Sequence, residues 1–208
     1  MFNEKFVTDY INATYEPEGI AFDIGANHGL YTKVLAERFK KVYAFEPIPY
    51  NIGVLKRAVS NFPNVEVIEK AVSDKTGLTD IFICLGNDGG HTLNENLAGR
   101  EAWGHKKERK TTIQTITLDE FVEQNGIEKI DFIKCDTEGA ENFLFNGAVD
   151  TLKRLHDLKI ILEVHHDVDY ARLYQFFTDL GYKIFDSGYN RATELSVDNH
   201  YLIQKSIL

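Results

Sequence analysis

The chain alternates short apolar runs with longer segments whose apolar positions recur at helical spacing. Runs with the length of strands occur at residues 20–24, 41–46, 64–69, 130–136 and 158–165. Amphipathic helices, with apolar residues about 3.6 positions apart, are predicted at residues 30–40, 50–61, 118–125, 140–155 and 170–180. Because strands and helices alternate, the pattern predicts an α/β fold, a Rossmann-like and mostly parallel sheet with helices on both faces.

The two ends of the chain depart from this alternation. Residues 3–14 predict a short helix within an N-terminal segment, 1–18, which either packs on the sheet edge or covers a ligand. Residues 182–186 and 200–204 read as strands with no helix between them, which predicts an antiparallel C-terminal hairpin at one edge of the sheet.

The middle of the chain contains a long polar segment. Residues 79–85 and 111–117 alternate like antiparallel strands, and the segment 86–110 lies between them. A connection of this length suggests a lid or an acceptor-binding loop. It carries a basic patch, which is either solvated or in contact with an acidic or phosphorylated acceptor. The patch is formed by Arg100, His105, Lys106, Lys107, Arg109 and Lys110.

Composition narrows the class of protein. The 208 residues, 43% hydrophobic and 26% charged, suit a single domain over 1–208. A net charge of −9 argues against nucleic acid or an anionic membrane surface as the main partner. No apolar run approaches the roughly 20 residues of a membrane span, and the start of the chain lacks the pattern of a secretion signal.

The two cysteines bear on location. Cys84 and Cys135 read as buried free thiols, which predicts a cytoplasmic location. Assembly of identical copies is left open.

The strongest local motif is the glycine-rich turn that follows the first strand. Gly25 and Gly29 permit a sharp turn and close approach of a ligand. Glu46 ends the next strand about 20 residues further on, where nucleotide-binding α/β units place an acid for ribose hydroxyls. Asp23 would repel a pyrophosphate but suits a positive sulfonium or ammonium group. The motif favours a nucleoside-containing cofactor over a purely structural turn.

Further chemistry is expected where later strands end. Ligands of such sheets bind beyond the carboxyl ends of the strands, which makes Asp136, Glu163 and His165 candidate site residues. His166 alternates with His165, so at most one of the two should face the site, and we favour His165. Glu138 and Glu141 also follow the strand that ends at Asp136. Their simpler interpretation is favourable charge at a helix N-terminus.

Four motifs in order give the chain a family resemblance. Asp23-x-Gly-x-Asn-x-Gly29, Phe45-Glu-Pro-x-Pro49, Lys134-x-Asp-x-Glu-Gly-x-Glu141 and Glu163-Val-His165 resemble the FkbM family of S-adenosylmethionine (SAM)-dependent methyltransferases over about residues 20–185. The resemblance implies a seven-strand methyltransferase sheet and O-methylation of a small-molecule hydroxyl, on a sugar or secondary metabolite. By position it implies cofactor contacts from Asp23, Gly25, Asn27, Gly29, Glu46, Pro47, Ala71 and Asp74. The sequence departs from many relatives at Gly90-His-Thr-Leu93, where they carry serines.

The chemistry of methyl transfer to oxygen leaves two options at the acceptor. A carboxylate or histidine could remove the hydroxyl proton, or a divalent ion could lower the hydroxyl pKa. Asp136, Glu163 and His165 are the catalytic candidates and also the candidate Mg²⁺ ligands. A nicotinamide-dependent oxidoreductase is an alternative, although the turn lacks its third glycine. A non-catalytic nucleoside-binding module of the same fold is another.

Overall fold

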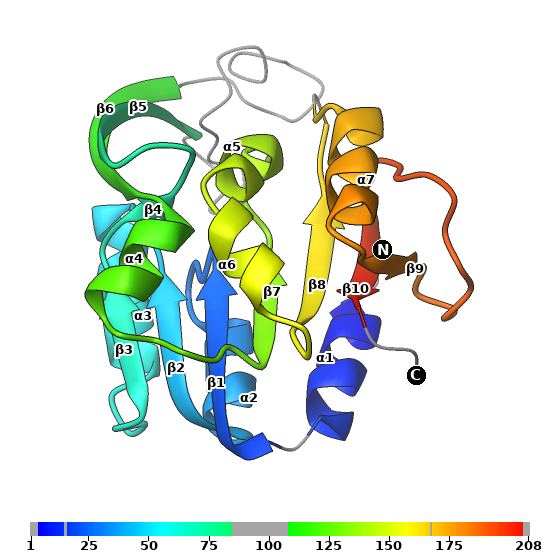
Figure 1. Ribbon diagram of the computed structural model, residues 1–208. Coiled ribbons are helices and arrows are strands. Elements are labelled where there is room, and N and C mark those ends of the chain that lie inside the picture. The colour runs from blue at the N-terminus through cyan, green and yellow to red at the C-terminus, as the bar shows by residue number, and fades with distance from the viewer. Residues whose placement is uncertain (1–3, 15, 85–107, 167, 206–208) are drawn as a thin grey trace.

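The computed structural model describes residues 4–14, 16–84, 108–166 and 168–205. Its main sheet has seven strands in the order β3-β2-β1-β7-β8-β10-β9 (Figure 1). The five parallel strands are β1 (Glu16–Ile24), β2 (Phe39–Phe45), β3 (Val65–Ile68), β7 (Phe132–Cys135) and β8 (Lys159–Val164). The predicted α/β class and mostly parallel sheet are confirmed.

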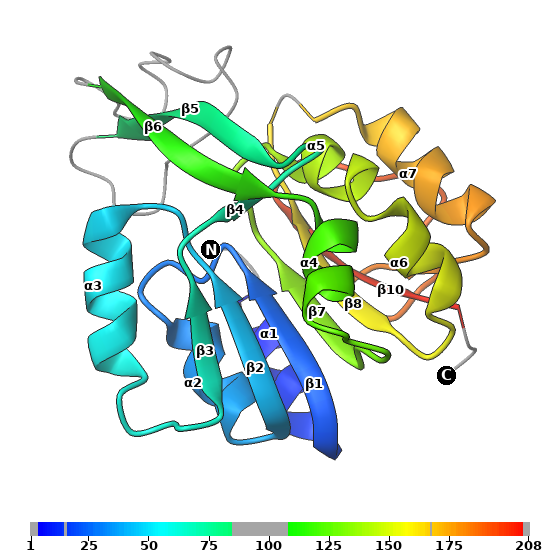
Figure 2. The ribbon, with the colours of Figure 1, turned by 60° about the vertical axis from the view of Figure 1, so that its left-hand side comes forward.

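Helices cover both faces of this sheet (Figure 2). One face is covered by α1 (Glu4–Ala13), α2 (Leu30–Ala36) and α3 (Pro49–Ala58). The other is covered by α4 (Leu118–Gln124), α5 (Glu141–Asn146), α6 (Val149–Arg154) and α7 (Tyr170–Asp179). The sheet residues facing α4 to α7 form the largest apolar cluster, which includes Phe22, Phe45 and Ile133. Burial of this apolar surface is the main force that holds the strand ends in place.

The predicted C-terminal hairpin is confirmed. β10 (Asn199–Gln204) runs antiparallel to β8 and also to β9 (Lys183–Phe185), so β10 lies between these two strands. In this register His200 is opposite Glu163. The last strand of the chain therefore delivers a histidine to the end of β8, which matters for the site described below.

A second, three-stranded sheet lies beyond the carboxyl ends of the parallel strands (Figure 2). It consists of β4 (Ala71–Val72), β5 (Gly77–Cys84) and β6 (Glu108–Ile116), in the order β4-β6-β5. β5 and β6 are antiparallel, as predicted, but they form their own sheet. A small apolar cluster contains Ile81 and Ile113 of this sheet together with Ile48. The second sheet is thereby fixed above the main one.

One helix prediction is confirmed and another needs correction. The helix predicted at 3–14 is α1, Glu4–Ala13, and β1 begins at Glu16, still within the N-terminal segment 1–18. The single helix expected at 140–155 is two helices, α5 and α6. A Cβ atom at Gly147 would lie 2.1 Å from the Ser73 carbonyl oxygen, so the backbone passes too close to Ser73 for any other residue. The Asp119 carboxylate then accepts the backbone N–H of Thr151 at 2.7 Å, which begins a new helix.

The remaining expectations concern composition and the central loop. Cys135 is a buried free thiol, as predicted. Among the described residues, no helix is long and apolar enough to cross a bilayer. The predicted lid 86–110 falls mostly outside the described residues, although residues 108–110 belong to β6. There Lys110 forms an ion pair with Asp80 of β5 at 2.9 Å.

Candidate functional site

The glycine-rich turn joins the ends of three strands. The N–H groups of Gly25 and Ala26 donate to the carbonyl of Phe45, at 3.1 and 2.9 Å. Gly25 has φ 79°, and a Cβ atom at this position would lie 1.8 Å from the Asp136 carbonyl oxygen. Only glycine permits this approach. The turn continues through Asn27, φ 47°, to Gly29, φ 85°, which precedes α2.

A cavity opens at this point, between the main sheet and the second sheet. The space free of protein atoms within it, counted together with open solvent at its mouth, is about 640 Å³. Its walls include the predicted cofactor residues Gly25, Asn27, Glu46, Pro47 and Ala71, together with Asp136. The cavity therefore connects the ends of β1, β2 and β7, as the sequence predicts.

Glu46 is held at one end of this cavity by backbone donors. Its Oε2 accepts the N–H of Asn27 and its Oε1 accepts the N–H of Ile48, both at 2.9 Å. Burial raises the pKa of Glu46 from 4.5 to about 7, although these hydrogen bonds favour the charged form. Asn51 lies beside Glu46, is 2% exposed, and its Oδ1 has no hydrogen-bond partner among the described residues. Buried polar atoms normally have partners, so this end of the cavity suits a polar ligand.

Asp136 lies at the other end of the cavity and is held by a buried lysine. Lys134 Nζ lies 3.2 Å from Asp136 Oδ2 and 3.7 Å from Asp23 Oδ1, and it donates to the Gly25 carbonyl at 3.2 Å. Burial would raise the pKa of Asp136, but the charges of Lys134 and His165 hold it below its usual value. Asp136 is therefore a fixed anion at the cavity wall.

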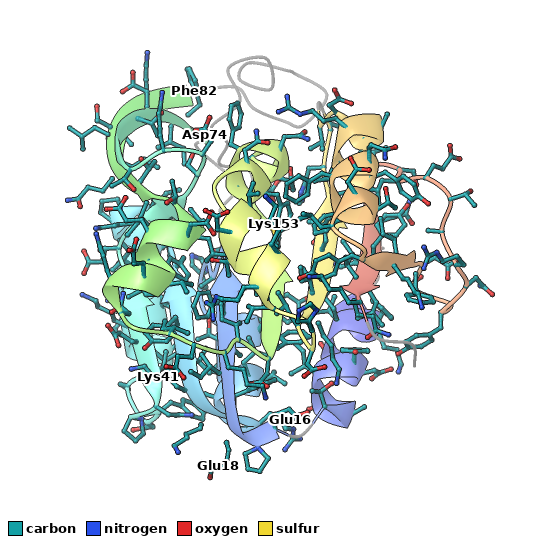
Figure 3. All side chains as sticks on the ribbon, in the orientation of Figure 1. Glu16, Glu18, Lys41, Asp74, Phe82 and Lys153 are labelled. Carbon is teal, nitrogen blue, oxygen red and sulfur yellow. The ribbon has the colours of Figure 1, made fainter. Side chains whose placement is uncertain are left out.

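Asp23 does not line the cavity. Its carboxylate is fully buried, accepts a hydrogen bond from Thr32 at 2.5 Å and lies near Lys134. This position suggests that Asp23 supports the turn from behind, and its direct contact with a cofactor stays a prediction. Gly29 likewise shapes the turn without lining the cavity. Asp74 is exposed and lies beside the second sheet (Figure 3), whereas Ala71 at the start of the same segment does line the cavity.

A cluster of acids, of which only Glu141 is fully buried, surrounds the buried His165 next to Asp136. His165 Nδ1 lies 2.7 Å from Glu141 Oε1. Its Nε2 lies 3.5 Å from Asp136, 3.7 Å from Glu163 and 3.8 Å from Glu138. Burial lowers the pKa of His165, but the hydrogen bond to Glu141 and the surrounding carboxylates outweigh it and raise the pKa to about 10. The imidazole is accordingly a cation at neutral pH.

His200 and Glu138 are the remaining members of the cluster around His165. His200 Nε2 lies 3.1 Å from Glu163 Oε2, so Glu163 lies between two histidines. Burial raises the pKa of Glu138 to about 8, and the nearby Asp136, Glu163 and Glu141 add to the rise, whereas His165 opposes it. His166 is outside the cluster, near Asp198 at 3.7 Å, so of the two neighbouring histidines His165 is the one that faces the site.

The structure brings together a different set of candidate metal ligands from the set that the sequence predicts. Within the described residues, Asp136, Glu138 and His165 can offer ligand atoms within 4.8 Å of one another. The sequence grouped Glu163 with Asp136 and His165 instead. This donor set fits Mg²⁺ poorly, because one of its three members is an imidazole and Mg²⁺ prefers oxygen ligands.

Several cavity residues were missed from the sequence. They are Ile48, Asn51, Lys70, Ile81, Thr137, Glu138 and Ala140. Asn51 follows Glu46 by five residues on the first turn of α3, so its position near Glu46 could have been inferred. Ile81 comes from the second sheet, and no local pattern places that sheet above the cavity.

The sheet order, the glycine turn, the acid at the end of β2 and the cavity beyond the strand ends define an α/β protein of the methyltransferase type. Comparison with known proteins makes this more specific. The Methyltransferase FkbM domain family matches residues 23–184, and the chain belongs to this family.

The individual proteins that resemble this chain share only limited sequence identity with it. The chain is 26% identical over 150 residues to the 2-O-methyltransferase NoeI of Sinorhizobium fredii, covering 67% of this chain and 61% of the relative. It is 26% identical over 158 residues to the hexuronic acid methyltransferase AglP of Haloferax volcanii, covering 74% and 59%. The chain thus spans about three fifths of the length of each. A Streptococcus mutans protein, assigned as a methyltransferase and solved in complex with S-adenosylhomocysteine (SAH), shares the fold at 13% identity, with a TM-score of 0.54 and coverage of 96% and 95%.

Proposed function

We propose that this chain is a SAM-dependent O-methyltransferase whose acceptor is a hydroxyl of a sugar or a related small molecule. The observation that carries the proposal is the single cavity that joins Glu46 at one end to Asp136 and the His165 cluster at the other. The methyl-transferring relatives support the reaction, and their names, a 2-O-methyltransferase and a hexuronic acid methyltransferase, support a sugar-type acceptor.

The residues present fit a nucleoside cofactor. Glu46 offers carboxylate oxygens to ribose hydroxyls, and the unpartnered Asn51 Oδ1 offers a further acceptor beside it. Pro47, Ile48, Val72 and Ile81 provide apolar walls for a base, next to Ala71. The glycine turn lets the cofactor lie close to the backbone at Gly25 and Asn27. The SAH complex of the structural neighbour is consistent with this arrangement.

Methyl transfer needs alignment and removal of a proton. When bound, SAM supplies a methyl group on a positively charged sulfur. The cavity then has to hold the acceptor oxygen in line with sulfur and methyl, which positioning can do with a large gain in rate. Asp136, fixed by Lys134, lies where it can accept a hydrogen bond from the acceptor hydroxyl. Glu163 and His165 act behind it by holding the acids in place.

We propose that the reaction does not require magnesium. Asp136, Glu163 and His165 are the candidate ligands from the sequence, but Glu163 lies 3.1 Å from His200, and the ring of His165 lies 2.7 Å from Glu141 and offers nitrogen where Mg²⁺ prefers oxygen. The nicotinamide alternative has less support, since the turn lacks the third glycine of dinucleotide folds and the relatives are methyltransferases. The free thiol of Cys135 supports a reducing, cytoplasmic location as part of the proposal.

The first test is a calorimetric titration of the purified protein with SAH, using NAD as the control ligand. Micromolar binding of SAH without binding of NAD is expected. The second test measures radiolabel transfer from methyl-tritiated SAM to a panel of methyl hexosides and methyl hexuronides. NAD binding alone would overturn the methyltransferase assignment. Binding of SAH without transfer to any of these sugars would overturn the sugar acceptor.

A further inference from the structure

Glu138 has an unusual backbone conformation at the cavity wall. Its φ is 53°, and among the described residues only Asn27, Tyr189 and Asp198 are other non-glycine residues with positive φ. Such a conformation costs about 1–3 kcal/mol and is concentrated at functional sites. Glu138 and Asn27 both line the cavity. The next residue, Gly139, has φ 94°, so two successive residues adopt positive φ before α5 begins.

The other acids near His165 are held in ways that make them poor proton acceptors. Asp136 faces Lys134 through Oδ2 and His165 through Oδ1. Glu141 is fully buried against His165 Nδ1, and Glu163 contacts both His165 and His200. Neither Glu141 nor Glu163 lines the cavity. Asp136 and Glu138 line it, and the charges of Lys134 and His165 lower the pKa of Asp136, which makes Asp136 a weak base.

Glu138 is positioned for contact with a ligand. Its side chain is 31% exposed and lines the cavity, and its Oε2 lies 3.8 Å from His165 Nε2. His165 is fixed in orientation by Glu141, so the cation beside Glu138 does not move away. Because the pKa of Glu138 is raised to about 8, its carboxylate form becomes available as the pH rises through that value, and this form, open to the cavity, can accept a proton from a bound hydroxyl.

We infer that Glu138 is the general base of the reaction and that Asp136 orients the acceptor hydroxyl. The inference rests on the proposed function. In the step, the acceptor oxygen forms a bond to the methyl carbon as the sulfur–methyl bond breaks, and the bonding pair stays on sulfur. The hydroxyl proton passes to the Glu138 carboxylate. A positive sulfonium and a negative carboxylate become a neutral thioether and a neutral acid, so charge is conserved. Glu141 is a positioning residue that acts through His165.

The test compares Glu138→Gln and Glu138→Asp with wild type and with a matched control, Glu123→Gln, an exposed glutamate on α4. Calorimetry measures SAH affinity for each protein. Initial rates with labelled SAM measure kcat and acceptor KM, using whichever methyl hexoside or hexuronide wild type methylates fastest. For Glu138→Gln we expect kcat to fall about 10²–10⁴-fold, with SAH affinity and acceptor KM nearly unchanged. Glu138→Asp should recover part of the rate, and Glu123→Gln should match wild type.

The outcomes separate this inference from the proposed function. If wild type binds SAH but methylates none of the sugars, the proposed acceptor fails and this inference fails with it. If wild type is active and Glu138→Gln keeps its rate, the inference alone is overturned. A Glu138→Gln protein that loses SAH affinity in parallel with rate would make Glu138 a cofactor-binding residue, which also overturns it. If Glu138→Gln does not fold, Glu138→Asp decides: an undiminished kcat would be incompatible with a base whose oxygen must reach the acceptor.

Discussion

The Nδ1 atom of His165 lies 2.7 Å from Oε1 of Glu141, and both side chains are buried. The pair links the end of β8 to the first residue of α5, 24 positions earlier in the chain. It fixes the ring so that Nε2 faces the carboxylates of Asp136, Glu138 and Glu163. A cation held at this point offsets part of the repulsion among the acids at this end of the cavity, although the remaining repulsion still adds to the raised pKa of Glu138.

Removing either partner should destabilise the fold, and the two losses should differ. His165→Ala leaves Glu141 buried without its cationic partner, and we expect a loss of about 3–5 kcal/mol in the free energy of unfolding. Glu141→Ala leaves His165 near other carboxylates, so the loss should be smaller, about 1.5–3 kcal/mol. Urea unfolding of both single variants and the double variant measures the coupling. Strictly additive losses would contradict a direct interaction, and Glu123→Ala should change stability by less than about 0.5 kcal/mol.

Affinity for SAH should depend on pH through Glu46. Its pKa in the free protein is about 7, and donation from ribose hydroxyls would favour the charged form. Binding therefore lowers the pKa and releases a proton. We expect affinity to rise with pH up to about 7, by at most about tenfold per unit, and to level off above it. Calorimetry in two buffers of different ionisation enthalpy measures both affinity and proton release.

Glu46→Gln is the control for this assignment. It should weaken SAH binding at pH 8 by about 1.5–3 kcal/mol, the value of a charge-assisted hydrogen bond. Its affinity should no longer vary with pH between 5.5 and 8 (roughly one unit and more on either side of the Glu46 pKa). A variant that keeps the wild-type pH profile would remove Glu46 from the ribose role.

Asp136→Asn should affect turnover more than cofactor affinity. The amide keeps the size of the side chain but loses the charge that orients the acceptor, and it leaves Lys134 with Asp23 as its remaining buried acid. We expect kcat to fall by about tenfold or more, while SAH affinity stays nearly unchanged. Steady-state kinetics and calorimetry on the same preparation test this, with Asp157→Asn, at an exposed position, as the control. A pure binding defect would contradict the division between the two ends of the cavity.

The parts of the site that could be predicted are those encoded within one short segment. The turn at Gly25 and the acid at Glu46 belong to a strand–turn–helix–strand unit, so spacing alone places them. His200 could not be placed this way, because its contact with Glu163 depends on the register of β10 against β8. The break at Gly147 depends on a contact with Ser73, and Ile81 reaches the cavity only through the second sheet. The sequence did not single out Glu138, the residue that we infer to be the general base, because an acid near a helix N-terminus is already explained by favourable charge there.

Chelation should leave the enzyme active. Lys134 holds Asp136, Glu141 holds His165, and His200 lies 3.1 Å from Glu163, so each of these candidate ligands is already engaged by a side chain of the protein. Methyl transfer measured after dialysis against EDTA, with and without added MgCl₂, should proceed at the same rate. Loss of activity that magnesium restores, with SAH affinity unchanged, would show that a divalent ion lowers the pKa of the acceptor hydroxyl instead.

Gly25→Ala should damage both the fold and the site. The added Cβ would lie 1.8 Å from the Asp136 carbonyl oxygen, and the φ of 79° is itself unfavourable for alanine. Gly126 has a similar φ of 59°, but no atom lies within 4 Å of such a Cβ. Gly126→Ala therefore measures the cost of placing alanine at positive φ without a steric clash. We expect about 1–2 kcal/mol of destabilisation at Gly126, and about 1–3 kcal/mol more at Gly25 from the clash. Urea unfolding measures both losses of stability.

The Gly25 variant should also lose SAH affinity, because relief of the clash must displace either the turn or Asp136. Equal losses at the two glycines would mean that β1 and β7 do not approach as closely at this turn as the structure shows.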